Sequence, residues 1–101
     1  MEPANHLHIE SLPEAWTDKD VIMLHACFQL LTDAIEKQHL FSGELNWDFD
    51  ESSRKAKAEL EELYRWWAQR KIQENTLEQN RYEKDTEMLI RLIKVRGYMW
   101  I

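Results

Sequence analysis

The sequence predicts an all-α fold, a three-helix bundle that forms a single domain over residues 1–101. The chain contains only two glycines and two prolines, too few for the many turns of a β-sandwich or barrel. Between Glu44 and Arg96 there is neither glycine nor proline, and apolar residues recur there at helical spacing. A chain of this length can bury one hydrophobic core, so we expect one domain.

The first helix is expected over residues 17–39. Thr17 is a suitable N-cap, and Asp20 follows three positions later, where a carboxylate can reach back to the helix start. Two apolar seams then run side by side at helical spacing: Val21, Leu24, Phe28, Leu31 and Ile35, and Met23, Cys27, Leu30 and Ala34. Together they cover about half of the helix circumference, so we expect this helix to pack against two neighbours.

Segments without helical periodicity flank this helix. Residues 1–16 contain both prolines and are predicted to form an extended N-terminal arm. Residues 40–53 are predicted to form a loop that lies along the core, because three apolar residues alternate there: Leu45, Trp47 and Phe49.

Two further helices are predicted at about 53–74 and 77–96, with Gly97 ending the second of them. Three residues could cap the earlier one: Asp50, Ser52 and Ser53. A reversal near Asn75–Thr76 would make the two helices a hairpin, whereas their fusion into one helix of about 65 Å would require a partner chain. We favour the hairpin because a compact domain of this size has a radius of gyration of about 13 Å.

The net charge of −6 is unevenly distributed along the chain. Residues 1–50 carry ten acidic residues against two lysines, a balance of −8, and residues 51–101 carry nine acidic against eleven basic residues, a balance of +2. The acidic half should repel phosphate backbones, so direct nucleic-acid binding is not expected. No apolar run approaches the roughly 18 residues of a membrane span, and the single cysteine fits a reducing compartment.

Metal-ligand patterns occur in the sequence, but each lacks the partners that a site needs. Glu36 and His39 form one Glu-x-x-His unit, whereas a di-metal bundle needs two such units and further glutamates. Glu59 and Glu62 resemble the Mg²⁺-binding pair of all-helical nucleotide pyrophosphohydrolases, but the second acidic pair at the required spacing is missing. A third group lies in the arm: His6, His8 and Glu10. We therefore predict no metal, cofactor or catalytic site, and no enzyme.

The remaining ionisable residues fit ordinary structural roles. Cys27 lies on an apolar seam and His25 on the polar side of the same helix, so a Cys–His nucleophile pair is not expected. Opposite charges alternate four residues apart in the second half, which is typical of exposed helix faces: Lys55/Glu59, Lys57/Glu61, Glu61/Arg65, Arg70/Glu74, Arg81/Asp85 and Glu87/Arg91.

Aromatic and acidic residues indicate a surface for a partner protein. Trp66 and Trp67 are adjacent on one helix, so their side chains diverge by about 100° and one narrow seam cannot bury both. Trp66 is predicted either to anchor an interface or to pack against the 40–53 loop. The residues predicted to bind a partner are Trp66, Tyr64, Arg70, Asp18, Asp20, Asp33 and Glu36.

Three stretches of the chain carry a family resemblance: WTDKDVIMLHACFQLLTDAIEK (16–37), ELEELYRWWAQRK (59–71) and YEKDTEMLIRLIKVRGYMW (82–100). They resemble a group of small uncharacterised proteins of tailed bacteriophages, best in pairing a Tyr-x-Trp-Trp helix with a Met-Leu-x-Arg-Leu-Ile-x-x-Arg-Gly-Tyr-x-Trp ending. The resemblance implies a phage or prophage product that acts in the host bacterial cytoplasm. It implies no functional residues.

These observations lead to three functional hypotheses. The first is a phage-encoded module that binds and inhibits or modulates a host protein, such as a defence or nucleic-acid enzyme, through an acidic and aromatic surface. The second is a structural or assembly protein that forms a homo-oligomer, in the simplest case a homodimer. The third is a divergent metal-dependent nucleotide hydrolase.

Overall fold

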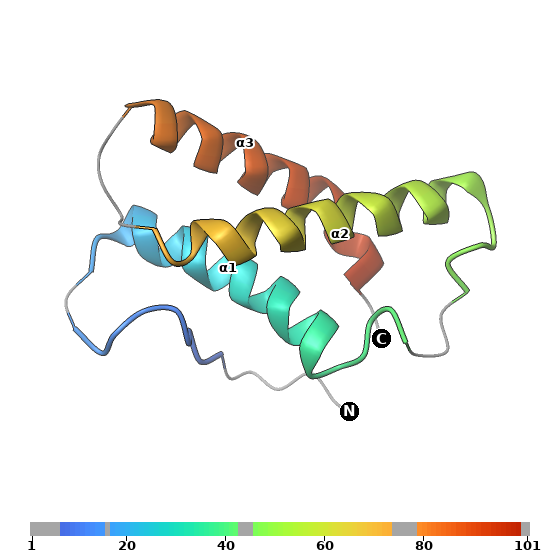
Figure 1. Cartoon of the computed structure of the whole chain (residues 1–101), viewed down its shortest axis with the longest axis horizontal. Coiled ribbons are helices and arrows are strands. Elements are labelled where there is room, and N and C mark those ends of the chain that lie inside the picture. The colour runs from blue at the N-terminus through green and yellow to red at the C-terminus, as the bar shows by residue number, and fades with distance from the viewer. Residues whose placement is uncertain (1–6, 16, 43–45, 74–78, 100–101) are drawn as a thin grey trace.

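The computed structural model describes residues 7–15, 17–42, 46–73 and 79–99 and confirms the all-α class. Three helices, α1 (Lys19–Glu36), α2 (Glu51–Arg70) and α3 (Gln79–Val95), pack together, and a 3₁₀ turn, η1 (Arg96–Met99), follows α3. The described residues contain no strand. Figure 1 shows that α1 and α3 run in the same general direction and that α2 runs in the opposite direction.

The ends of α1 differ from the predicted limits of 17 and 39. Asp18, not Thr17, occupies the N-cap position, and the Thr17 hydroxyl donates to the carbonyl of Ala15 instead. At the other end His39 adopts a left-handed conformation with φ of 55°, which turns the chain out of the helix. The Leu40 N–H then donates to the carbonyl of Ala34, and this bond ends α1 three residues earlier than predicted.

The start of α2 follows from a predicted cap. The Asp50 carboxylate accepts a hydrogen bond of 2.7 Å from the backbone N–H of Ser53, and this bond lowers the pKa of Asp50. The helix begins two residues before the predicted start at 53. It ends at Arg70 instead of 74.

The hairpin alternative is correct, because α2 and α3 are separate helices that pack against each other. The predicted reversal at Asn75–Thr76 lies outside the described residues. The prediction that Gly97 ends the last helix in a left-handed conformation is wrong, since Gly97 continues into η1 and its φ is not positive. The radius of gyration is 14.2 Å, in line with a folded hairpin and not a 65 Å rod.

One face of α2 supplies the centre of the core. Its buried side chains recur every three or four residues: Ala56, Leu60, Leu63, Trp67 and Arg70. Trp67 stacks on Phe28 of α1, with ring centroids 4.9 Å apart and planes inclined by 21°. Met88 and Leu92 cover the same face from α3. The α2 stripe therefore contacts both other helices.

The loop before α2 only partly follows the predicted alternation. Trp47 is buried, and its indole N–H donates to the carbonyl of Leu40 at 3.2 Å. Phe49 was expected beside it but is 77% exposed, because residues 47–50 form a turn and not an extended segment. Leu45 lies outside the described residues.

Two arginines form ion pairs between α2 and α3 instead of along one helix face. Arg70 of α2 donates from Nε and Nη2 to the two carboxylate oxygens of Asp85 on α3, at 2.8 Å each. Arg91 of α3 pairs with Glu59 and also reaches Glu62 at 3.1 Å. Glu87, the predicted partner of Arg91, pairs with Lys84. Two arginines, each paired with carboxylates of the other helix, thus hold α2 and α3 together.

The Arg70–Asp85 contact should contribute far more to stability than an exposed ion pair on the same helix. Their side chains are 5% and 14% exposed, so Asp85→Ala would remove two charge-assisted hydrogen bonds from a buried guanidinium. We expect a loss of about 3 kcal/mol in the free energy of unfolding, measured by urea denaturation.

Glu87→Ala is the matched control, because the Lys84–Glu87 pair is about half exposed on both sides. It should cost about 0.5 kcal/mol or less. Equal losses in the two variants would show that the Arg70–Asp85 contact does not hold the hairpin together.

Stability should also depend on pH through Glu59. Its hydrogen bond from Arg91 lowers the pKa of the Glu59 carboxyl in the folded protein. The resulting stabilisation is fully present above the pKa of the unfolded chain, about 4.3, and is lost as pH falls through the lower folded value. In Glu59→Gln the decline of the free energy of unfolding between about pH 5 and pH 2 should be shallower. If the decline at acid pH were as steep in Glu59→Gln as in the parent, Glu59 would not be the source of this pH dependence.

Candidate functional site

Three of the predicted partner-binding residues come together at one groove. Asp18 and Asp20 at the start of α1 and Arg70 at the end of α2 line a hollow of about 370 Å³ between α1 and α3. We call it the α1–α3 groove. Its remaining lining residues are Val21, Met23, Leu24, Tyr82, Asp85, Thr86 and Leu89.

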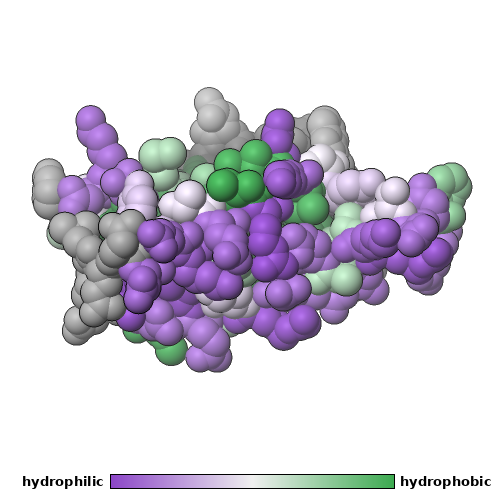
Figure 2. All heavy atoms as spheres, turned by 90° about the horizontal axis from the view of Figure 1, so that it is seen from above, coloured by the Kyte–Doolittle hydropathy of each residue, from purple (hydrophilic) through white to green (hydrophobic). Residues whose placement is uncertain are grey.

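Both helices that form the groove also carry large, exposed apolar side chains. Met23 is 60% exposed, and Leu30, two turns further along the same face of α1, is 51% exposed. On α3, Tyr82 is 50% and Ile93 48% exposed. Figure 2 views the face that points up in Figure 1, the side of α3, and shows apolar atoms gathered in a patch among hydrophilic ones.

Only half of the predicted second apolar seam of α1 is buried or partly buried. Ala34 is buried and Cys27 is partly buried, whereas Met23, which lines the groove, and Leu30 are both more than half exposed. α1 packs against α2 and α3, and the N-terminal arm covers a further face of it, where three polar residues are buried: His25, Gln29 and Thr32. Apolar spacing alone could not show that polar residues would take the buried positions.

The charge at the end of the groove is negative. Asp18 and Asp20 are both exposed. The cation nearest to them among the lining residues, Arg70, is already held by Asp85. We call four exposed side chains the apolar strip: Met23, Leu30, Tyr82 and Ile93. A partner would therefore meet two carboxylates as well as this strip, a combination that favours an amphipathic segment carrying a basic group.

The other predicted partner-binding residues lie elsewhere. Trp66 packs against Phe28, with ring centroids 5.3 Å apart, and is only partly exposed. Tyr64 donates its hydroxyl to the Glu36 carboxylate, which raises the pKa of Tyr64. Asp33 accepts from Gln29 at 2.8 Å and pairs with Lys37. Trp66 thus serves the core at least in part, and it does not line the groove with Asp18 and Asp20.

The N-terminal arm is tied to the flank of α1. Ser11 Oγ lies 2.7 Å from His25 Nδ1, and the Glu10 N–H donates to Gln29 Oε1 at 3.1 Å. His25 lies on the polar side of α1, but this side is not open to solvent, because the ring is fully buried and meets Trp67 edge-on at 4.7 Å. Burial of the imidazole is possible because the arm supplies a hydrogen-bond partner, which helical periodicity cannot reveal.

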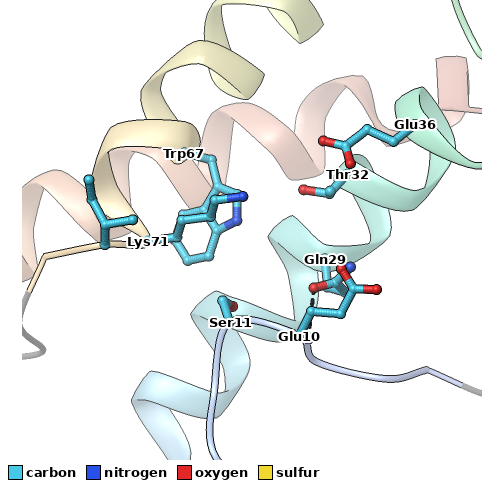
Figure 3. A pocket seen from close by; sticks show the side chains of 8 residues that line it. Glu10, Ser11, Gln29, Thr32, Glu36, Trp67 and Lys71 are labelled. Atoms are coloured by element: carbon cyan, nitrogen blue, oxygen red, sulfur yellow. Dashed lines mark hydrogen bonds between the residues drawn. The ribbon is translucent and has the colours of Figure 1, made fainter.

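The arm also closes a second pocket. A hollow of about 320 Å³ lies between the arm, α1 and the end of α2 (Figure 3). Its lining consists of Glu10, Ser11, Gln29, Thr32, Glu36, Trp67, Lys71 and Ile72. Sequence reasoning gave no sign of this pocket, since its residues come from three distant segments.

The candidate metal-ligand patterns acquire other partners. Arg91 faces both Glu59 and Glu62, and Glu10 pairs with Lys37 at 2.9 Å. Within the described ranges no three side chains of His, Cys, Asp or Glu are placed to hold a metal ion together. Burial raises the pKa of the Cys27 thiol, which disfavours the reactive thiolate.

None of the helices in the described part is long and apolar enough to cross a membrane. Comparison of the chain with protein-family models, curated proteins and solved structures found no match.

Proposed function

We propose that the protein is a protein-binding module that receives an amphipathic helix of a partner protein in the α1–α3 groove. The observation that carries this proposal is the open apolar strip. Met23 and Leu30 on one helix and Tyr82 and Ile93 on the other are each about half exposed or more. Met23 and Tyr82 line the groove, and Leu30 and Ile93 lie further along the same two helices. Large apolar side chains exposed on helices that form a groove are typical of interaction sites.

Charge favours one kind of occupant. The carboxylates of Asp18 and Asp20 stand at one end of the groove, and the whole chain has a net charge of −6. A partner helix with lysine or arginine near one end and apolar residues along one face would complement both features. Desolvation of the apolar strip would supply affinity, and the acidic end would set the orientation of the helix.

The family resemblance supports a host protein as this partner. A phage or prophage product of this kind would act in the bacterial cytoplasm as an inhibitor or modulator, for example of a defence or nucleic-acid enzyme. An acidic module could occupy a basic surface that such an enzyme uses for nucleic acid. A second copy of the chain is the rival occupant, and it would make the protein a homodimer.

The test is capture of a partner by tagged protein from bacterial lysate, compared between matched variants. Met23→Gln/Leu30→Gln alters the strip without touching the core and should leave helicity and the free energy of unfolding within about 0.5 kcal/mol of the parent. We expect the amount of partner that it captures to fall at least tenfold below that of the parent. Asp18→Asn/Asp20→Asn should slow association and reduce its dependence on salt.

Phe49→Gln is the control, because Phe49 is a large, 77% exposed apolar residue away from the groove. It should capture the partner as the parent does. Equal capture by the parent and the Met23/Leu30 variant would refute the groove. The alternative result is that the parent protein sediments as a dimer that Met23→Gln/Leu30→Gln converts to a monomer. This result would identify a second copy of the chain as the occupant of the groove and refute a heterologous partner.

A further inference from the structure

The second pocket is independent of the groove and has walls of distinct chemistry. Figure 3 shows the Trp67 indole on one side and the Thr32 and Glu36 oxygens on the α1 side, with Ser11 and Gln29 below. Trp67, Gln29 and Thr32 are 2%, 3% and 6% exposed, so this part of the lining is fixed by the core. The rim comes from exposed side chains of Lys71 and Ile72.

Each fixed polar side chain of the lining keeps hydrogen-bonding capacity for a ligand. The Thr32 hydroxyl donates to the Phe28 carbonyl at 2.9 Å, which leaves its oxygen able to accept. Gln29 donates one of its two amide hydrogens to Asp33. Ser11 Oγ is oriented by His25. The pocket is therefore preorganised for a small polar molecule.

One anion and one cation line the pocket without pairing to an opposite charge. Glu36 accepts the Tyr64 hydroxyl, a neutral donor, and makes no ion pair in the described part of the chain. Lys71 likewise has no carboxylate partner there. Glu10, the other acid of the lining, is neutralised by Lys37 at 2.9 Å.

We propose that this pocket binds a free α-amino acid with an apolar side chain. Its ammonium group would lie against Glu36 and the Thr32 oxygen, and its carboxylate against Lys71. The apolar side chain would rest between the Trp67 indole and Ile72. A volume of about 320 Å³ is at the lower end of small-molecule sites, which suits a ligand of this size and excludes nucleotides.

The experiment is ligand-observed NMR and calorimetric titration of the full chain with three related probes. L-phenylalanine carries both charges, N-acetyl-L-phenylalanine lacks the ammonium group, and L-phenylalanine amide lacks the carboxylate. We expect the zwitterion to bind in the millimolar range and each of the other two to bind roughly tenfold more weakly, because each loses one charged contact.

Two variants assign the contacts to their residues. Glu36→Gln keeps an acceptor for Tyr64 but removes the charge, and should weaken L-phenylalanine roughly tenfold without changing the affinity for the N-acetyl probe. Lys71→Met should weaken L-phenylalanine by a similar factor and leave the amide unchanged. Asp20→Asn, on α1 but outside this pocket, is the control and should bind all three probes as the parent does.

Three results would overturn the proposal. The first is no binding of L-phenylalanine at 20 mM by a folded protein, which thermal unfolding would verify. The second is equal affinity for all three probes, which would mean apolar contact with the indole alone. The third is a zwitterion affinity that neither Glu36→Gln nor Lys71→Met alters.

Discussion

One stripe of α2 serves two helices, and the rest of the structure depends on this constraint. Leu60 and Leu63 are fully buried, and Trp67 stacks on Phe28 of α1 while Arg70 pairs with Asp85 of α3. Since a stripe of this kind covers little more than a quarter of a helix, α1 and α3 must both lie close to it. They pack less extensively against each other than against α2, and the hollow between them is the α1–α3 groove.

The groove is thus a consequence of helix packing, and its chemistry depends on the side chains that stay exposed when the helices pack. Met23, which lines the groove, and Leu30 on the same face of α1 remain 60% and 51% exposed. Asp18 and Asp20 lie at its end because α1 starts there. The N-terminal arm lies on another flank of α1, where it lines a second pocket that is more polar than the groove.

Helical periodicity predicted the fold because it reports the buried faces directly. The stripe Ala56, Leu60, Leu63 and Trp67 was evident from spacing, and so was the seam through Leu24, Phe28 and Leu31. The helix ends were less predictable, since His39 ends α1 by adopting a left-handed conformation that nothing in its spacing indicates. Of the sites, spacing could indicate Asp18 and Asp20 as exposed acids but not their position beside the apolar strip.

The burial of His25 on the polar side of α1 shows why the sequence did not indicate the second pocket. A buried imidazole requires a hydrogen-bond partner, and here Ser11 of the arm provides one from 14 residues away. The ion pairs show the same limit, because Arg91 pairs with Glu59 across 32 residues and not with its neighbour one turn away. Contacts between distant segments determine both the burial of His25 and the partner of Arg91, and local sequence patterns carry no information on such contacts.

The methionine methyl groups test most directly whether the groove is open. The side chain of Met23 is 60% exposed and that of Met88 only 2%, so a soluble paramagnetic agent should broaden the Met23 methyl resonance strongly and spare that of Met88. The two signals can be assigned with Met23→Leu and Met88→Leu. Equal protection of both methyl groups at low micromolar concentration would show that the groove is filled, and it would contradict the account given above.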